Sequence, residues 1–168
     1  MNFLDIIIFL ILLLSVINGI KDGFIKTFFF LIGTILGLIL ATKYNSVFTP
    51  VIMKLININS IEAQIIAYVI LFVISGLIMK VFYRLLIKSN RILFLWDKIF
   101  GGILGLLESM IILSLILIIL HSFNFPSESV INNSIFYYSI YNFAPQVFDI
   151  IKTIIPGTNS FFEEFYLL

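Results

Sequence analysis

Residues 3–42 read FLDIIIFLILLLSVINGIKDGFIKTFFFLIGTILGLILAT, two long apolar runs separated by Lys21, Asp22 and Gly23. A helix needs roughly 20 mainly apolar residues to cross a hydrocarbon core of about 30 Å. Each run is close to that length, and two later runs are of the same kind. The sequence therefore predicts four transmembrane helices, at residues 3–20, 24–42, 63–79 and 99–120.

The composition supports a protein that lives in a lipid bilayer. Of 168 residues, 61% are hydrophobic and 11% are charged, whereas soluble domains carry about 25% charged residues. The absence of cysteine excludes disulfides and thiolate metal sites. We predict an all-α polytopic membrane protein, with a four-helix transmembrane domain at residues 1–121 and a short amphipathic tail at residues 122–168.

Basic residues predict the orientation, because loops that stay in the cytoplasm are enriched in Lys and Arg. The first and third gaps between the predicted spans lie on the same side of the membrane. Seven basic residues lie on that side: Lys21, Lys26, Lys80, Arg84, Lys88, Arg91 and Lys98. The other side has three: Lys43, Lys54 and Lys152. The richer side should face the cytoplasm. Both termini then lie on the outer, periplasmic side of a bacterial inner membrane.

Small residues recur at every fourth position in three of the predicted helices: Ser15, Gly19 and Gly23; Gly33, Gly37 and Ala41; Gly101, Gly105 and Ser109. Such stripes let helix backbones approach closely in lipid. Packing within the bundle is the favoured interpretation. Because three stripes exceed what one internal contact needs, the alternative is that one of them forms a homo-oligomer interface.

The connections between the predicted spans also carry signals. Residues 48–53 are too apolar for a solvated loop, so we expect a short interfacial helix or a re-entrant piece there. Asn59 followed by Glu62 predicts a capping box that begins the third span. In the tail, residues 134–143 and 145–155 predict two short amphipathic helices, and residues 160–166 a final aromatic segment. We expect this tail to lie on the outer leaflet or to cover the bundle.

Glu108 is the one ionisable residue that lies deep in a predicted span. It comes nine residues after Ile99, which places it about 13 Å into the helix at 1.5 Å per residue. A carboxylate at that depth costs roughly 3 kcal/mol on insertion scales and faces the bundle interior. Glu108 is therefore either a proton carrier or a neutral side chain hydrogen-bonded to a neighbouring helix, and the sequence leaves both open.

Asp5 and Asp97 lie near the ends of predicted spans. Asp5 is one turn into the first span, where it could act as a capping group, pair with a neighbour or hydrate at the interface. Asp97 precedes the fourth span beside Trp96, and both suit a helix start at a membrane surface. The basic gap at residues 80–98 is mainly a topology signal, with anionic lipid headgroups as an alternative ligand.

Motifs for catalysis are missing from the chain. His121 is the only histidine, and no HExxH, GxSxG, P-loop or cluster of metal ligands occurs. We therefore expect no enzyme, no cofactor, no metal and no nucleic-acid partner. The expected partners are the lipid bilayer and either a second copy of the chain or an envelope protein.

Three motifs occur in an order that resembles the bacterial colicin V production protein family: NFLDII at residues 2–7, GIKDGF at residues 19–24 and LWDKIFGGILG at residues 95–105. The resemblance runs to about Gly157. The chain departs from the family at Asp22, where an arginine is usual, and at Glu108, where a basic or small residue is more common. The resemblance implies four spans and a role in colicin V toxin production or export and in envelope physiology.

Two functional hypotheses follow. The first is a non-enzymatic inner-membrane accessory protein that presents its outer tail to a partner. The second is a small oligomeric channel or proton-coupled transporter that uses Glu108. Four helices enclose little space, so transport would need an oligomer. The accessory hypothesis is preferred.

Overall fold

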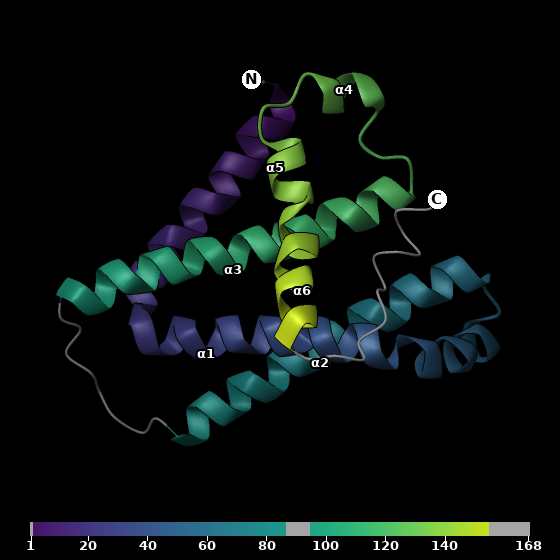
Figure 1. The fold of residues 1–168 in the computed structure, drawn as a ribbon, viewed down its shortest axis with the longest axis horizontal. Helices are drawn as coiled ribbons and strands as arrows, with labels where there is room; N and C mark the ends of the chain where they lie inside the picture. Colours follow the sequence, from purple (N-terminus) through teal and green to yellow (C-terminus); the bar gives the residue numbers. More distant parts are fainter. Residues whose placement is uncertain (1, 87–94, 155–168) are drawn as a thin grey trace.

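The computed structural model describes residues 2–86 and 95–154, and within these ranges it contains helices and no strands. Figure 1 shows three long helices and three short ones: α1 (Phe3–Ile56), α2 (Ser60–Leu86), α3 (Leu95–Ser122), α4 (Glu128–Asn132), α5 (Tyr137–Tyr141) and α6 (Phe143–Ile154). The all-α prediction is confirmed. Lys88, Arg91 and the predicted aromatic segment at residues 160–166 lie outside the described residues.

The first two predicted spans are two arms of one helix, α1. Gly23 separates a first arm (residues 3–22) from a second arm (residues 24–56), with φ 77° and ψ 169°. Only glycine adopts this backbone region readily, because a Cβ would collide with the neighbouring peptide. Figure 1 shows the chain changing direction sharply at this point.

Within residues 2–86 and 95–154, three helices are long and apolar enough to cross a membrane. The predicted count of four is not confirmed, because the predicted gap at residues 21–23 contains a kink instead of a loop. A straight 54-residue helix would measure about 80 Å, far more than the hydrocarbon core. The kink lets each arm have a direction of its own.

Asp97 stabilises the kink from another helix. Gly23 interrupts the helical hydrogen-bond ladder, so the amide of Phe24 begins a new helix without its usual acceptor. The Asp97 carboxylate, in the first turn of α3, accepts a hydrogen bond from the Phe24 N–H at 3.1 Å. The start of α3 therefore caps the second arm of α1.

The prediction of a separate interfacial helix at residues 48–53 is wrong, because α1 continues through Pro50 to Ile56. A proline removes one N–H from the helix ladder. In compensation, Ile52 packs against Ala63 and Ala67 of α2, so tertiary contact holds this last part helical. The helix ends at Asn57, which has left-handed backbone angles.

The cap predicted at Asn59 is present, and the helix begins three residues before the predicted start of the third span at residue 63. The Asn59 side chain accepts a hydrogen bond from the Glu62 N–H at 2.9 Å, and α2 begins at Ser60. An Asn in this position satisfies one of the amides that a helix start leaves without a partner.

The small-residue stripes pack against other helices of the same chain. A Cβ on Gly101 would collide with the carbonyl oxygen of Gly19, and a Cβ on Gly105 would lie 2.7 Å from the carbonyl oxygen of Ser15. The first arm and α3 are therefore in backbone contact. On the second arm, a Cβ on Gly33 would lie 2.9 Å from Met79 of α2. The glycines of all three stripes are buried against other helical segments of the same chain.

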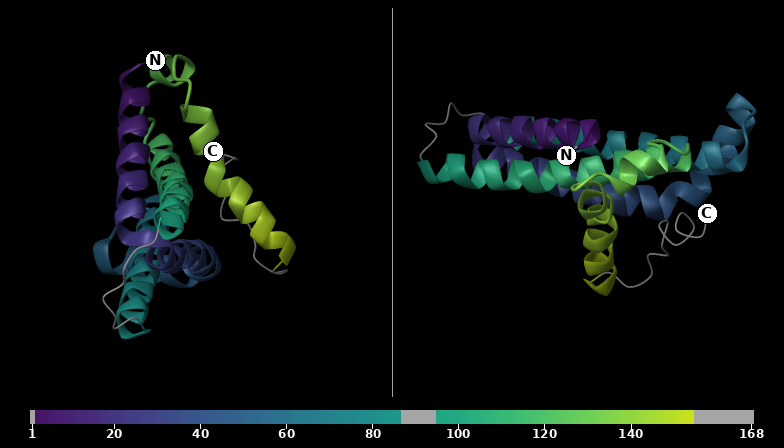
Figure 2. Two further views of the ribbon diagram at one scale, coloured as in Figure 1. Left: turned by 90° about the vertical axis from the view of Figure 1, so that its left-hand side faces the viewer. Right: turned by 90° about the horizontal axis from the view of Figure 1, so that it is seen from above.

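The tail forms three short helices packed on α3. The predicted helices at residues 134–143 and 145–155 correspond to the shorter α5 and to α6, which begins at Phe143. The short helix α4 was not predicted. Ser114 of α3 holds the α5–α6 junction: its hydroxyl donates to the Tyr141 carbonyl at 2.6 Å and accepts from the Ala144 N–H at 2.9 Å. Figure 2 shows α6 running across the long helices instead of along them.

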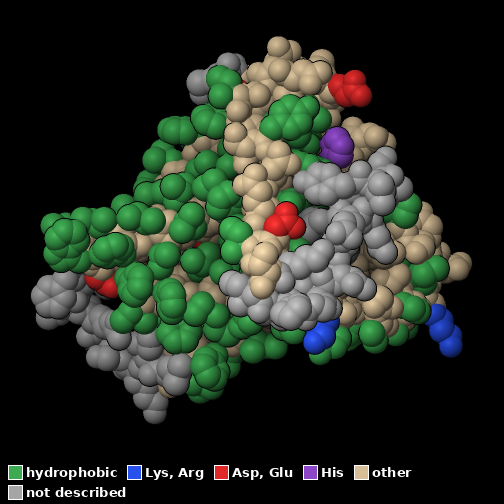
Figure 3. Space-filling view, viewed as in Figure 1, with side chains coloured by type: hydrophobic (Ala, Val, Ile, Leu, Met, Phe, Trp, Pro, Cys, Tyr) green, Lys and Arg blue, Asp and Glu red, His purple; other side chains and the backbone are tan. Residues whose placement is uncertain are grey.

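Apolar side chains are exposed on the outside of the long helices, as expected where lipid is the solvent. Hydrophobic side chains gather over the first arm of α1 and the beginning of α3 in Figure 3. Among the exposed residues are Leu14 of the first arm, Leu77 of α2 and Ile103 of α3. Polar side chains, in contrast, are buried between the helices, which is the pattern of a helix bundle in a membrane.

Candidate functional site

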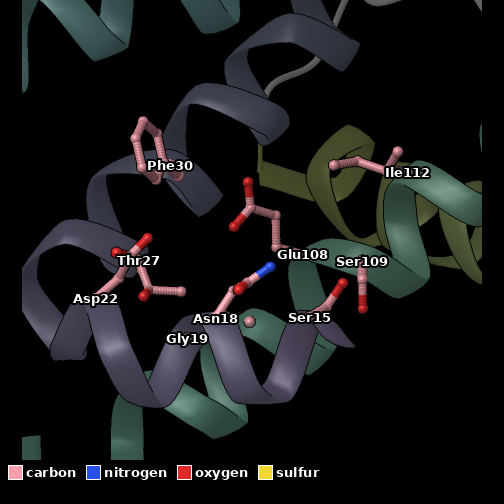
Figure 4. Close-up of a pocket in the computed structure, with 10 residues that line it drawn as sticks. Ser15, Asn18, Gly19, Asp22, Thr27, Phe30, Glu108, Ser109 and Ile112 are labelled. Carbon is pink, nitrogen blue, oxygen red and sulfur yellow. The ribbon is translucent and has the colours of Figure 1, made fainter. Parts of the chain in front are cut away.

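A polar cavity of about 190 Å³ lies between the two arms of α1 and α3. Figure 4 shows side chains from all three segments around it. Six of the ten residues that line it have polar side chains. The lining consists of Ser15, Asn18, Gly19 and Asp22 from the first arm, Thr27 and Phe30 from the second arm, and Gly105, Glu108, Ser109 and Ile112 from α3. The close approach of the glycine stripes sets the width of this space, because the helices touch at Gly19 and Gly105.

Glu108 is the central acidic group of the polar cavity. It lies in the middle of α3 and is half-buried, and the Thr34 hydroxyl of the second arm donates a hydrogen bond to it. Within the described residues, no Lys or Arg forms an ion pair with it. Glu108 therefore forms the interhelical hydrogen bond expected of a neutral structural side chain. It also lines a cavity, which a proton carrier would need.

Asp22 and Lys26 lie at the rim of the polar cavity, near the kink. Lys26 forms an ion pair with Asp22 at 2.6 Å, and its Nζ lies 5.7 Å from the centre of the Phe30 ring. Both members of the pair are about one-third exposed. Asp22 is therefore compensated by a cation, whereas Glu108 has no such partner in the described part of the chain.

Hydroxyl groups complete the lining. The Thr27 hydroxyl donates to the carbonyl of Gly23 at 2.9 Å, and the Ser109 hydroxyl donates to the carbonyl of Leu106 at 2.8 Å. These bonds satisfy each donor within its own helix. The oxygen lone pairs of both groups stay available as acceptors.

Beyond Ile112, an apolar cluster fills the bundle. Ile111 and Ile118 of α3 pack with Leu38 and Ala41 of the second arm, and Phe148 of α6 joins them. In a second cluster, Ile8 of the first arm packs near the same end of α3. Its other members are Leu113 and Leu117 of α3, Ile131 of α4, and Tyr137 and Ile140 of α5. The polar cavity is therefore bounded by packed hydrophobic side chains on the side away from Lys26.

Asp5 lies far from the polar cavity and joins the start of α1 to the tail. It is fully buried. One carboxylate oxygen accepts from the Ser134 hydroxyl at 2.5 Å and from the amides of Ile135 and Phe136 at 3.0 and 3.2 Å. The other accepts from the Asn2 N–H at 3.0 Å, and the Asn2 side chain accepts from the Asp5 N–H in return. This arrangement is a capping box extended by three contacts to the segment before α5.

The structure thus separates the three acidic residues that the sequence singled out. Glu108 lines the polar cavity, Asp97 caps the second arm, and Asp5 anchors the tail. His121 lies at the end of α3, and its Nδ1 is 3.3 Å from the Tyr137 hydroxyl. Burial raises the pKa of Tyr137 to about 12, so its hydroxyl stays protonated at neutral pH. Neither His121 nor Tyr137 lines the polar cavity.

Sequence reasoning missed Asn18, Asp22, Thr27 and Thr34 as parts of the site. A signal for them exists. Ser15, Asn18 and Asp22 are spaced three and four residues apart and therefore share one face of the first arm. Thr27 and Thr34 are seven residues apart and share a face of the second arm. Two polar faces on neighbouring spans, together with Glu108 on a third, predict a polar interior.

The arrangement can bind water, a proton or a cation through oxygen atoms. Within residues 2–86 and 95–154, no three His, Cys, Asp or Glu side chains come together as a metal site would require. The described residues around Glu108 contain no nucleophile–base pair comparable to a hydrolase triad. The chemistry that the lining supports is recognition of a small polar or charged species.

Comparison with known proteins gives one result. No curated protein and no solved structure matches the chain. The family model of the colicin V production protein matches residues 4–145, which include both arms of α1, all of α2 and α3, and the tail as far as the first turn of α6. The chain therefore belongs to the colicin V production protein family, and it is a membrane protein.

Proposed function

We propose that this protein is a non-enzymatic accessory protein of the bacterial inner membrane, with a role in colicin V production. The observation that carries the proposal is the family match over residues 4–145. The closely packed bundle supports it, because the glycine contacts and the Asp5 and Asp97 hydrogen bonds give a fixed scaffold. Such a scaffold suits a protein that holds a partner in place.

Within this proposal the chain crosses the membrane four times, with both termini on the outer side. Each arm of α1 has the roughly 20 residues that a crossing needs. In Figure 1 the kink, the end of α2 and the start of α3 lie toward the left, and the N-terminus, the α1–α2 turn and the end of α3 lie above or to the right. Lys21 and Lys26 lie next to the kink, and Lys98 lies at the start of α3. We name this end of the bundle the basic side and assign it to the cytoplasm.

The proposed partner is a second copy of the chain or another envelope protein, and its contact surface is the tail. The glycine stripes are already occupied within the chain, so they do not supply this surface. The tail exposes large apolar side chains at Ile135, Tyr138 and Ile150. Exposed apolar groups on the outer side suit contact with a protein or with the lipid surface.

A second candidate function is a small oligomeric channel or proton-coupled transporter, and the polar cavity favours it. A carboxylate without an ion-pair partner inside a membrane bundle is a functional hypothesis by default. Because apolar clusters close one side of the cavity, this candidate needs a conformational change or an oligomer to complete a pathway. A transporter therefore fits the structure better than an open pore.

One complementation experiment separates the two candidates. The test strain secretes colicin V and lacks its own member of this family, and secreted toxin is measured by inhibition of a sensitive lawn. Wild type is expected to restore secretion, and Glu108→Gln is expected to restore it equally, because the variant keeps the shape of the bundle. The accessory role is rejected if wild type fails to restore secretion. If Glu108→Gln inserts normally but fails, the transport candidate replaces it.

A further inference from the structure

The polar cavity carries one uncompensated charge. Asp22 is paired with Lys26 at 2.6 Å, so this pair contributes no net charge. Glu108 has a hydroxyl partner in Thr34 but, within the described residues, no cationic one. When Glu108 is ionised, the cavity carries a net charge of −1. Low dielectric surroundings make an unbalanced charge costly, so Glu108 is expected to take up either a proton or a small cation.

Polar groups from three helical segments line this space. The first arm supplies the Asn18 amide and the Ser15 hydroxyl, the second arm supplies Thr27, and α3 supplies Ser109 with Glu108. Hard cations prefer carboxylate, amide, hydroxyl and water oxygens as ligands. Calcium sites combine several carboxylates, whereas here a single carboxylate is uncompensated. The charge count therefore favours a monovalent cation over a divalent one.

The size of the polar cavity also suits a small ion. Its volume of about 190 Å³ corresponds to about six water molecules at roughly 30 Å³ each. This leaves room for one ion together with several waters that complete its shell. The lining does not have to supply every ligand.

Access to the cavity has a direction. The partly exposed Asp22–Lys26 pair lies at its rim, close to the kink. On the opposite side, the apolar cluster around Leu38, Ile111 and Ile118 is closely packed. An ion would therefore enter past Asp22 and stop at Glu108.

From these observations we propose that the polar cavity binds one small monovalent cation, with sodium as the probe ion. The ion would enter from the basic side and be held by Glu108 together with the Asn18 amide and the Ser109 hydroxyl. This inference rests on the transport candidate above, because it names the species that such a transporter would bind.

The test is equilibrium binding of radioactive sodium to the purified full-length protein in detergent, at fixed pH and with a large organic cation keeping the ionic strength constant. Wild type is expected to bind one sodium ion per chain saturably. Glu108→Gln should weaken binding by about tenfold or more, because the only uncompensated charge is gone. Ser109→Ala should weaken it by a smaller factor. Asp149→Asn, which removes an exposed carboxylate of α6, is the matched control and should bind as wild type does.

The outcomes separate this inference from the function on which it rests. If wild type shows no saturable sodium binding, or if Glu108→Gln binds as tightly as wild type, the inference is overturned. If Glu108→Gln fails to complement but the wild-type protein binds no sodium, the transport candidate is kept and only the proposed sodium site is rejected. Sodium binding that depends on Glu108, together with full complementation by Glu108→Gln, supports the cation site and removes the transport candidate.

Discussion

Replacing Gly101 with leucine is expected to unfold the bundle at a much lower temperature than wild type. A Cβ at this position would collide with the carbonyl oxygen of Gly19 and lie 2.8 Å from the carbonyl carbon of Gly23. These are backbone atoms, so they cannot move aside as a flexible side chain could. Overpacking of a closely packed interior costs about 1–3 kcal/mol or more. We expect an apparent Tm roughly 10 °C lower, measured as the monodisperse fraction left after heating in detergent.

Gly76 provides the matched control for this substitution. It lies within α2, and nothing lies within 4 Å of a Cβ built on it. Gly76→Leu is therefore expected to keep the Tm of wild type within about 2 °C, because no contact is lost and leucine is a good helix former. Equal stability of the Gly101 and Gly76 variants would contradict the packing of the first arm on α3.

Replacing Asp5 with alanine is expected to release the tail from the bundle. The buried carboxylate accepts hydrogen bonds from the Ser134 hydroxyl and from the amides of Ile135, Phe136 and Asn2. Each buried donor left without an acceptor costs about 1–3 kcal/mol, so the total loss should be about 4 kcal/mol. Limited proteolysis should then cut residues 122–142 far faster than in wild type, while the long helices stay intact.

Two further variants define the contribution of the Asp5 carboxylate. Asp5→Asn keeps one acceptor oxygen and should give intermediate protection of the tail. Glu128→Gln removes an exposed carboxylate from the same tail and should leave the digestion pattern unchanged. If Asp5→Ala resists digestion as wild type does, the Asp5 contacts do not hold the tail in place.

The sequence predicted the features that depend on local pattern. Apolar runs indicated the long helices, and the Asn59 cap indicated the start of α2. The spacing of the glycines indicated close helix contacts. Each of these follows from residues within a few positions of one another, because helix length, capping and face periodicity are local properties.

The features that the sequence did not predict depend on contacts between distant residues. Ser134 lies 129 residues from Asp5, and the Asp97 carboxylate caps an amide 73 residues earlier. Pro50 is a helix breaker by propensity, yet packing of Ile52 on α2 keeps the segment helical. The polar cavity exists only because the Gly23 kink places the second arm against the other two segments. No local pattern could place Thr27 opposite Glu108.

The polar cavity between the two arms of α1 and α3 is expected to be accessible to water from the basic side. The chain contains no cysteine, so single cysteines can be labelled with a charged, membrane-impermeant thiol reagent in vesicles of known orientation. Asn18→Cys is expected to react from the side of Lys21 and Lys26 and not from the other side. Leu13→Cys, on an exposed apolar face turned about 140° away from Asn18 around the helix, should react from neither side. An Asn18→Cys variant that is unreactive from both sides, or that reacts only from the side of the tail, would contradict the account.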